Sequence, residues 1–292
     1  GYAALDTNTT GSGNVALGYD ALGASTTHSG IVAIGENCLK TADANTNNVA
    51  IGKDAMELTT TGTGVAIGAY ALHNNTTGLR NIAIGYGTLD TNTTGDDNTA
   101  VGNLAMDGNT TGSRNTAVGE QALTSNTTAT NNVAVGYHAL DTSTTATANV
   151  AVGAFAMEDT TTGGYNTALG YYALGNHTTS GDNTAVGAES LFTLTTGNYN
   201  TALGKEALYT NNADHNTAVG NDAMKLNTTG TQNVAVGSAA LNVNTTGTYC
   251  TAVGYQALVA NTTANHNTGL GKMALYANTT GEQNTAVASN SL

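Results

Sequence analysis

Proline and tryptophan are absent from the 292 residues, phenylalanine occurs twice, and charged residues make up only 9% of the chain. Ordinary globular domains carry roughly a quarter charged residues, so this composition is not that of a typical domain. Low charge also occurs in disordered chains, but a disordered chain would not place an aliphatic residue at the same point of a regular repeat. The composition therefore favours an ordered repeat protein.

Positive charge is scarce as well, because 7 Lys and Arg stand against 20 Asp and Glu, for a formal net charge of -13. Nucleic acids and anionic membrane surfaces are bound through basic stripes, so we expect no nucleic-acid partner. No apolar run approaches the ~20 residues that span a bilayer, and we expect no membrane insertion. The two cysteines, Cys38 and Cys250, lie about twelve repeats apart, which is too far for a disulfide at ~4.8 Å per stacked strand. We expect Cys38 to be a small core residue.

A glycine recurs through the whole chain at intervals of 17 residues, with two intervals of 16 that end at Gly68 and Gly220. A fixed period of this length is typical of a solenoid, in which each repeat buries its apolar side only against its neighbours. We therefore expect residues 1–292 to form one continuous array of about 17 coils, and we expect this array to be part of a longer chain. The two shorter intervals should tighten the corner near the Thr-Thr-Gly segment and leave the strand phase unchanged.

The repeat has the consensus N-T-A-V-G-x-x-A-L-x-x-N-T-T-G-x-x, numbered here as positions 1 to 17. Position 2 is always β-branched and position 4 always aliphatic, so positions 1 to 5 predict a short strand. The sequence thus predicts a parallel β-solenoid, a β-roll or β-helix, with one coil per ~17 residues. Segments such as 53–60 and 205–212 after the glycine are rich in helix formers. They predict a short helical or 3₁₀ turn, and a second short strand is the alternative.

Alternation along the strand sets the expected directions of the side chains. We expect position 4, for example Val101, to point into the coil and position 3 to point outward. Position 3 is nevertheless Ala in every repeat except at Gly269, and a strand constrained on both sides is usually covered on both sides. We therefore predict that another copy of the chain covers an alanine column that includes Ala50, Ala100, Ala117, Ala134, Ala151 and Ala202.

Asparagine fills position 1 in 14 of 17 repeats, and stacked amides of this kind can form a hydrogen-bonded ladder. Thr-Thr at positions 13 and 14 follows a second asparagine at position 12. This creates Asn-x-Thr acceptor motifs for N-glycosylation, which would line one edge of the solenoid with glycans. The candidate sites are Asn8, Asn75, Asn92, Asn109, Asn126, Asn227, Asn244, Asn261 and Asn278.

The units NTAVG at 98–102 and NVAIG at 48–52 resemble the S-V-A-I-G core of head repeats in trimeric autotransporter adhesins. The full 17-residue repeat is similar to repeats of bacteriophage tail fibres and related surface fibres. The resemblance covers the whole chain. It implies a parallel β-roll in which chains assemble side by side, located outside the cell and bound to host or matrix surfaces.

Residues for catalysis or metal binding do not form recognisable patterns. The histidines form no His-x-x-x-His pair and have no recurring Cys or carboxylate at ligand spacing, so we expect no enzyme, no metal and no cofactor. The sequence favours an extracellular structural or adhesive fibre at a cell or virion surface. Its expected partners are further copies of the chain, as a trimer or filament, and a cell-surface or glycan receptor. The alternatives are an ice-binding solenoid, suggested by the threonine ranks, and a glycan-bearing filament.

Overall fold

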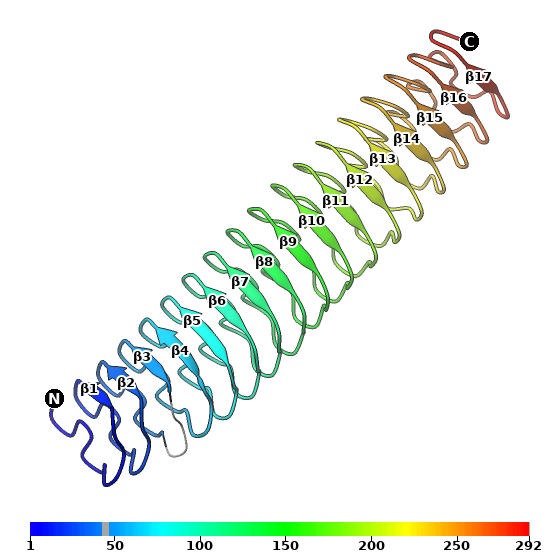
Figure 1. Cartoon of the computed structure of the whole chain (residues 1–292). Helices are drawn as coiled ribbons and strands as arrows, with labels where there is room; N and C mark the ends of the chain where they lie inside the picture. The colour runs from blue at the N-terminus through cyan, green and yellow to red at the C-terminus, as the bar shows by residue number, and fades with distance from the viewer. Residues whose placement is uncertain (43–46, 292) are drawn as a thin grey trace. The chain divides into compact units, whose positions relative to one another are not determined.

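The computed structural model describes residues 1–42 and 47–291, which fall into two compact units, Gly1–Thr147 and Ala148–Leu292. Each unit is a parallel β-solenoid whose coils follow the repeat (Figure 1). The strands of the first unit are β1 (Val15–Leu17), β2 (Val32–Ile34), β3 (Val49–Ile51), β4 (Gly64–Ile67), β5 (Asn81–Ile84), β6 (Thr99–Val101), β7 (Thr116–Val118) and β8 (Val133–Val135).

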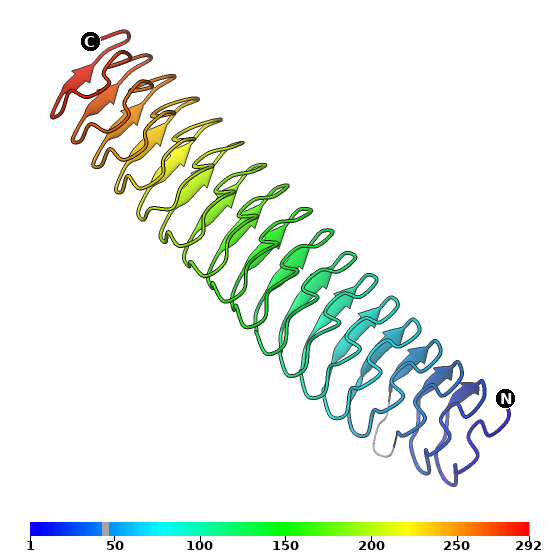
Figure 2. The same cartoon turned by 180° about the vertical axis from the view of Figure 1, so that it is seen from behind.

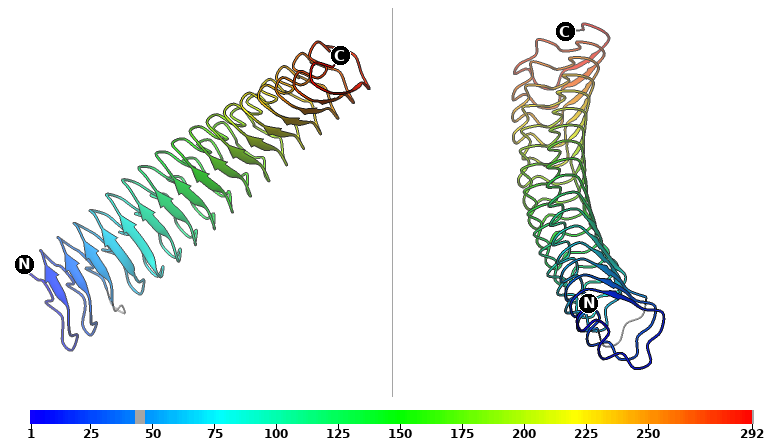
Figure 3. Two further views of the ribbon diagram at one scale, coloured as in Figure 1. Left: turned by 45° about the horizontal axis from the view of Figure 1, so that its top comes forward. Right: turned by 90° about the vertical axis from the view of Figure 1, so that its left-hand side faces the viewer.

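The second unit repeats the same element. Its strands are β9 (Val150–Val152), β10 (Thr167–Leu169), β11 (Thr184–Val186), β12 (Thr201–Leu203), β13 (Thr217–Val219), β14 (Val234–Val236), β15 (Thr251–Val253), β16 (Thr268–Leu270) and β17 (Thr285–Val287). Within each unit the strands form one side of the coils and the turn segments form the other (Figures 2 and 3).

Consecutive strands of a unit pair in parallel with like positions side by side. Thr116 of β7 lies beside Thr99 of β6, and Ala117 lies beside Ala100. The pairing also continues through the two 16-residue intervals, where Val49 pairs with Val65 and Thr201 with Thr217. The prediction that the strand phase survives the shorter coils is therefore confirmed.

The segment after the glycine is a run of turns, with no helix and no second strand in residues 1–42 and 47–291, so the predicted helical turn or second strand is wrong. Positions 7 and 9 take positive φ in coil after coil, as at Leu104 (φ 55) and Met106 (φ 53). The Leu104 N–H therefore bonds to Tyr86 of the coil before (2.9 Å), and the Met106 N–H bonds to Ala122 of the coil after (3.0 Å). In a helical turn these N–H groups would bond to carbonyls of their own coil, and the hydrogen bonds to the neighbouring coils would be lost.

A left-handed conformation costs an ordinary residue roughly 1–2 kcal/mol, which the hydrogen bonds to both neighbouring coils offset. The sequence carried a signal for it, because Asn, Asp and Gly tolerate positive φ best. These residue types recur at position 7, as Asp20, Asn37, Asp54, Gly87 and Asp222.

Close stacking explains the recurring glycine at position 5. Gly102 has φ 140, and a Cβ added there would lie 2.3 Å from the carbonyl oxygen of Gly119 in the next coil. Any side chain would force the coils apart. The last repeat carries Ala288 instead, and no described coil lies above it.

The interior of a coil is narrow. It holds the alanines of positions 3 and 8, the Leu or Met of position 9 and the amides of positions 1 and 12, as shown by Ala100, Ala105 and Met106, which are fully buried. Burying one Leu or Met side chain contributes about 1.5–3 kcal/mol. The strand and the turns opposite it come so close that positions 3 and 8 admit little more than a methyl group. Cys38 occupies position 8 and is buried, as predicted.

Candidate functional site

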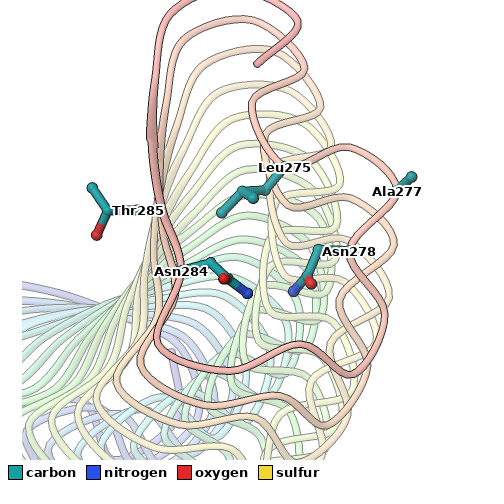
Figure 4. Close-up of a pocket in the computed structure, with 5 residues that line it drawn as sticks. All are labelled: Leu275, Ala277, Asn278, Asn284 and Thr285. Carbon is teal, nitrogen blue, oxygen red and sulfur yellow. The ribbon is translucent and has the colours of Figure 1, made fainter. Parts of the chain in front are cut away.

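The last coil of the second unit shows in section which positions face the interior (Figure 4). Leu275, Asn278 and Asn284, at positions 9, 12 and 1, point into the coil, whereas Thr285 at position 2 points away from it. These residues line a pocket of about 340 Å³ at the open face of this coil. The pocket is the coil interior itself, seen where no further described coil covers it.

The strand positions that face outward are 2 and 4, and together they form a surface that we call the outer face. In β7, Val118 is 37% exposed and Thr116 is half-buried, while Ala117 between them is 0% exposed. In the second unit the outer face is exposed to a similar degree, with Leu203 at 45%. The outer face carries only Val, Ile and Thr at position 2 and only Val, Ile and Leu at position 4.

The predicted direction of the strand side chains is therefore wrong. Ala50, Ala100, Ala117, Ala134, Ala151 and Ala202 are all fully buried inside the coils of their own chain, so they present no surface to a second copy. Alternation fixes which positions share a face but not which face is inside. The alanine column is small because the coil is thin, and the strand surface that the described residues of its own unit leave uncovered is that of positions 2 and 4.

Position 1 forms the predicted ladder of asparagines. The Asn98 Oδ1 accepts the backbone N–H of Asn115 in the next coil (3.0 Å), and the Asn98 Nδ2 donates to the carbonyl of Gly112 in its own coil (2.8 Å). Cys250 takes this place in one coil, where its Sγ donates to the carbonyl of Ala264 (3.3 Å). The ladder thus ties each coil to the next and closes the corner within each coil.

A second amide ladder, at position 12, was missed in the sequence. Asn92 donates to Asn75 (2.8 Å), Asn109 to Asn92 (2.7 Å) and Asn126 to Asn109 (2.6 Å), each from Nδ2 to Oδ1. The recurrence of asparagine at position 12 was the available signal, but the following threonines made it resemble a glycosylation motif.

This ladder changes the interpretation of the predicted glycosylation sites. Asn75, Asn92, Asn109, Asn126, Asn227, Asn244 and Asn261 are fully buried and hydrogen-bonded in the coil interior, whereas Asn8 and Asn278, near the chain ends, are half-buried. A glycan on any of the seven buried amides would replace interior hydrogen bonds and would not fit the closed coil. The folded protein therefore does not offer these seven nitrogens for modification.

The threonine pair that follows the second ladder divides between two roles. The position 13 hydroxyl donates to the position 13 carbonyl of the next coil, as from Thr93 to Thr110 (3.0 Å). The position 14 threonine, for example Thr111, is exposed. The pair therefore offers one outward rank, as expected from an extended segment.

One histidine occupies a position of the second ladder. His177 is fully buried, and its Nε2 lies 2.6 Å from the carbonyl oxygen of Ser180, which can only accept, so Nε2 carries the proton. Its Nδ1 then accepts from the hydroxyl of Thr160 (2.9 Å). Burial lowers the pKa of His177 from 6.5 to about 4, so the side chain is neutral at pH 7. It replaces an asparagine in the interior.

The remaining candidate groups are dispersed. Residues 1–42 and 47–291 contain no cluster of three or more His, Cys, Asp or Glu placed to hold a metal ion. Cys38 and Cys250 are both free and buried, and burial raises the pKa of the Cys38 thiol to about 12. The same residues contain no helix long and apolar enough to cross a membrane.

Fold and surface together describe a repeat protein, a parallel β-solenoid with an uncharged outer face of aliphatic residues and threonine. No model of a known protein family matches the chain, and no curated protein matches it either.

Proposed function

We propose that this chain is the structural unit of an extracellular fibre in which copies assemble side by side through their outer faces. The observation that carries the proposal is the stripe of positions 2 and 4, in which position 4 is aliphatic in every repeat and position 2 is Val, Ile or, in 9 of 17 repeats, Thr. The stripe is continuous along the strands of each unit and is exposed or half-exposed there. Monomeric soluble proteins rarely expose large contiguous apolar patches, and such patches mark interaction sites.

The chemistry of the outer face favours a second copy as its partner. The cores of protein interfaces are depleted of charged residues, and the outer face contains none among its 17 repeats. Its side chains are β-branched or otherwise aliphatic and regularly spaced, so two such faces can interdigitate in the same way along their length. A slender coil with a small core gains further stability from such burial.

The resemblance of units such as NTAVG to adhesin and tail-fibre repeats supports a location outside the cell, at a cell or virion surface. In such an assembly the turn side stays accessible when the outer face is covered. The turn side is then the surface for attachment to a cell-surface or glycan receptor.

Sedimentation equilibrium of a charge-bearing variant tests self-association. Replacing Val101, Val118 and Val135 by Lys places three charges on the outer face of the first unit without entering a coil. Each buried charge should cost the interface several kcal/mol, so the variant should be monomeric where the wild-type chain associates. The matched control places Lys at Thr94, Thr111 and Thr128, which are exposed at position 14 of the same coils.

Both variants change the net charge from -13 by three, to -10. The control should therefore associate as the wild type does. A wild-type chain that stays monomeric at every concentration, or equal association of the two variants, contradicts the proposal.

An ice-binding solenoid is the second candidate, because the outer face offers two parallel ranks of side chains where the Thr-Thr pair offers one. In that case the chain should remain monomeric and slow the growth of ice crystals, and the lysine variant of the outer face should lose that activity. The position 14 control should keep it.

A further inference from the structure

A pocket of about 240 Å³ lies on the turn side of the first unit, where three successive coils meet. Its walls combine two tyrosines, two carboxylates, one leucine and a glycine backbone. They are Tyr70, Tyr86, Gly87, Asp90, Leu104 and Asp107.

The pocket lies beside a glycine at a position where the neighbouring coils carry a side chain. Tyr70, Gly87 and Leu104 are the position 7 residues of successive coils, and only Gly87 among them lacks a side chain. Its φ of 58 is the conformation that Gln121 adopts at position 7 two coils later (φ 54). The backbone therefore does not require glycine here. A Cβ at Gly87 would lie only 2.8 Å from Cδ2 of Leu104, closer than van der Waals contact, so a side chain here would displace the end of the Leu104 side chain and reshape the pocket wall.

The carboxylates of the pocket carry more negative charge than the neighbouring chain neutralises. Asp90 Oδ1 lies 3.2 Å from the Nδ1 of His73, whose Nε2 lies 3.0 Å from Glu57. Asp107 has no ion pair or side-chain hydrogen bond within the described residues. None of the six residues that line the pocket is Lys or Arg.

Partial burial makes this charge costly. It raises the pKa of Asp90 above its ordinary value, although His73 opposes the effect. It also raises the pKa of Asp107, and the negative charge of Asp90 adds to that rise. A cation placed between these groups would lower the free energy of both ionised carboxylates.

The other walls suit a cation with an apolar stem. The ring of Tyr86 is 55% exposed and meets the ring of Tyr70 edge to face, with centroids 5.8 Å apart. Aromatic faces attract cations through their quadrupole, and the side chain of Leu104 adds apolar contact. The carboxylates thus suit the charged end of such a ligand, and the tyrosine and leucine side chains suit its apolar stem.

We propose that this pocket binds a primary alkylammonium group, with the ammonium at Asp107 and Asp90 and the carbon chain against Tyr86 and Leu104. Such a group can come from a lysine side chain of a partner protein or from a free aliphatic amine. The site lies in a different column from the outer face, so the inference does not rest on the proposed self-association.

Titration of the ¹⁵N-labelled chain, followed through the amide signals of Tyr86 and Leu104, tests the site. One arm uses Nα-acetyl-lysine N-methylamide, a second uses 1,5-diaminopentane, and a third uses the lysine probe acetylated at Nε. We expect saturable binding of one or both amines with Kd on the order of 1 mM, which corresponds to about -4 kcal/mol. We expect at least tenfold weaker binding of the acetylated probe. Preference for the lysine probe identifies a protein partner, and preference for the diamine identifies a free amine.

Two variants and a control locate the binding. Gly87→Gln places a side chain against Leu104 in the pocket wall, using a residue that position 7 already accepts at Gln121, and Asp107→Asn removes a carboxylate charge. Each should weaken amine binding at least tenfold and leave the circular dichroism spectrum unchanged. Asp6→Asn removes an exposed carboxylate from the same repeat position in another coil and should change the Kd less than twofold. The absence of saturable amine binding, equal binding of the acetylated probe, or unchanged Kd in both pocket variants would overturn the proposal.

Discussion

On the inner face of β7, Ala117 is fully buried, and on the outer face of the same strand Val118 keeps more than a third of its surface in solvent. Both faces follow the repeat in sequence, the inner one with alanine in every repeat but one and the outer one with Val, Ile, Leu or Thr. Their regularity has different origins. The inner face is restricted to alanine because the coil is thin, and the outer face is restricted to aliphatic and β-branched residues although no described residue of its own unit covers it.

The comparison shows that a repeat position restricted to a few residue types through all coils need not be buried. A small residue held constant indicates close approach of two backbones, here the strand and the turns of one coil. An exposed face that carries only aliphatic residues and threonine in every coil instead supports the proposed partner outside the chain. The inner face therefore determines the stability of the coil, and under the proposed function the outer face determines what the coil associates with.

The largest expected effect separates the two faces directly. Ala117→Gln overfills the coil and buries an amide without a partner, so the free energy of unfolding should fall by about 2–5 kcal/mol. Val118→Gln, one residue further along, points outward and should change it by less than about 0.5 kcal/mol. Denaturant unfolding followed by circular dichroism, at a concentration where the chain is monomeric, compares the two. A larger loss in the Val118 variant would reverse the assignment of the faces.

A second effect of similar size concerns an interior group that titrates. His177 has a folded pKa of about 4 against 6.5 unfolded, so the unfolded chain takes up the proton first as the pH falls. The stability due to the neutral histidine is complete above pH 6.5 and is lost toward pH 4, by up to about 3 kcal/mol.

His177→Asn should remove this pH dependence, because an asparagine at position 12 donates to the position 15 carbonyl without titrating, as Asn109 does to Gly112. Melting temperatures between pH 7 and pH 4 measure the difference from the wild type. His266→Asn, at an exposed corner, serves as the control and should melt with the wild-type pH profile. An equal acid response of wild type and His177→Asn would show that the histidine does not drive it.

How far the sequence alone predicts this structure differs between its parts. The period, the strand positions and the position 1 ladder follow from repetition, because like residues must stack in a parallel solenoid. Repetition does not determine which face of the strand points into the coil, because alternation fixes only which positions share a face. The turn segment was predicted wrongly because Ala, Leu and Met are good helix formers, whereas hydrogen bonding to two neighbouring coils decides the conformation of residues such as Leu104 and Met106.

The candidate sites were predictable to a smaller degree. The aliphatic column at position 4 was found, but it was placed in the core. Asn109 and its equivalents were assigned to glycans because the motif for modification coincides with the motif for the interior ladder. The pocket at Gly87 depends on one missing side chain among three stacked coils, and a single glycine at position 7 does not reveal it.

The smallest expected effect sharpens the description of the interior. The second ladder of the first unit stops at Asn126, whose Oδ1 has no hydrogen-bond partner among the described residues, and the next position 12 residue is Ser143, whose buried Oγ has none among them either. Ser143→Asn should continue the ladder by donating to Asn126 and raise the free energy of unfolding by about 1 kcal/mol. Urea unfolding measures the gain. A loss of stability would mean that the coil at residue 143 is too narrow for the amide.

Self-association through the outer face is the central claim, and protection of a thiol tests it at the level of one residue. In Val118→Cys the introduced thiol lies on the outer face, and in Thr111→Cys it lies at exposed position 14. The native Cys38 and Cys250 contribute little background because both are buried. Alkylation rates are measured by mass spectrometry over a range of protein concentrations. The account predicts that the thiol of the Val118→Cys variant reacts at least tenfold more slowly as the chain associates, while the thiol of the Thr111→Cys variant keeps its rate. Equal, concentration-independent rates at both positions would contradict it.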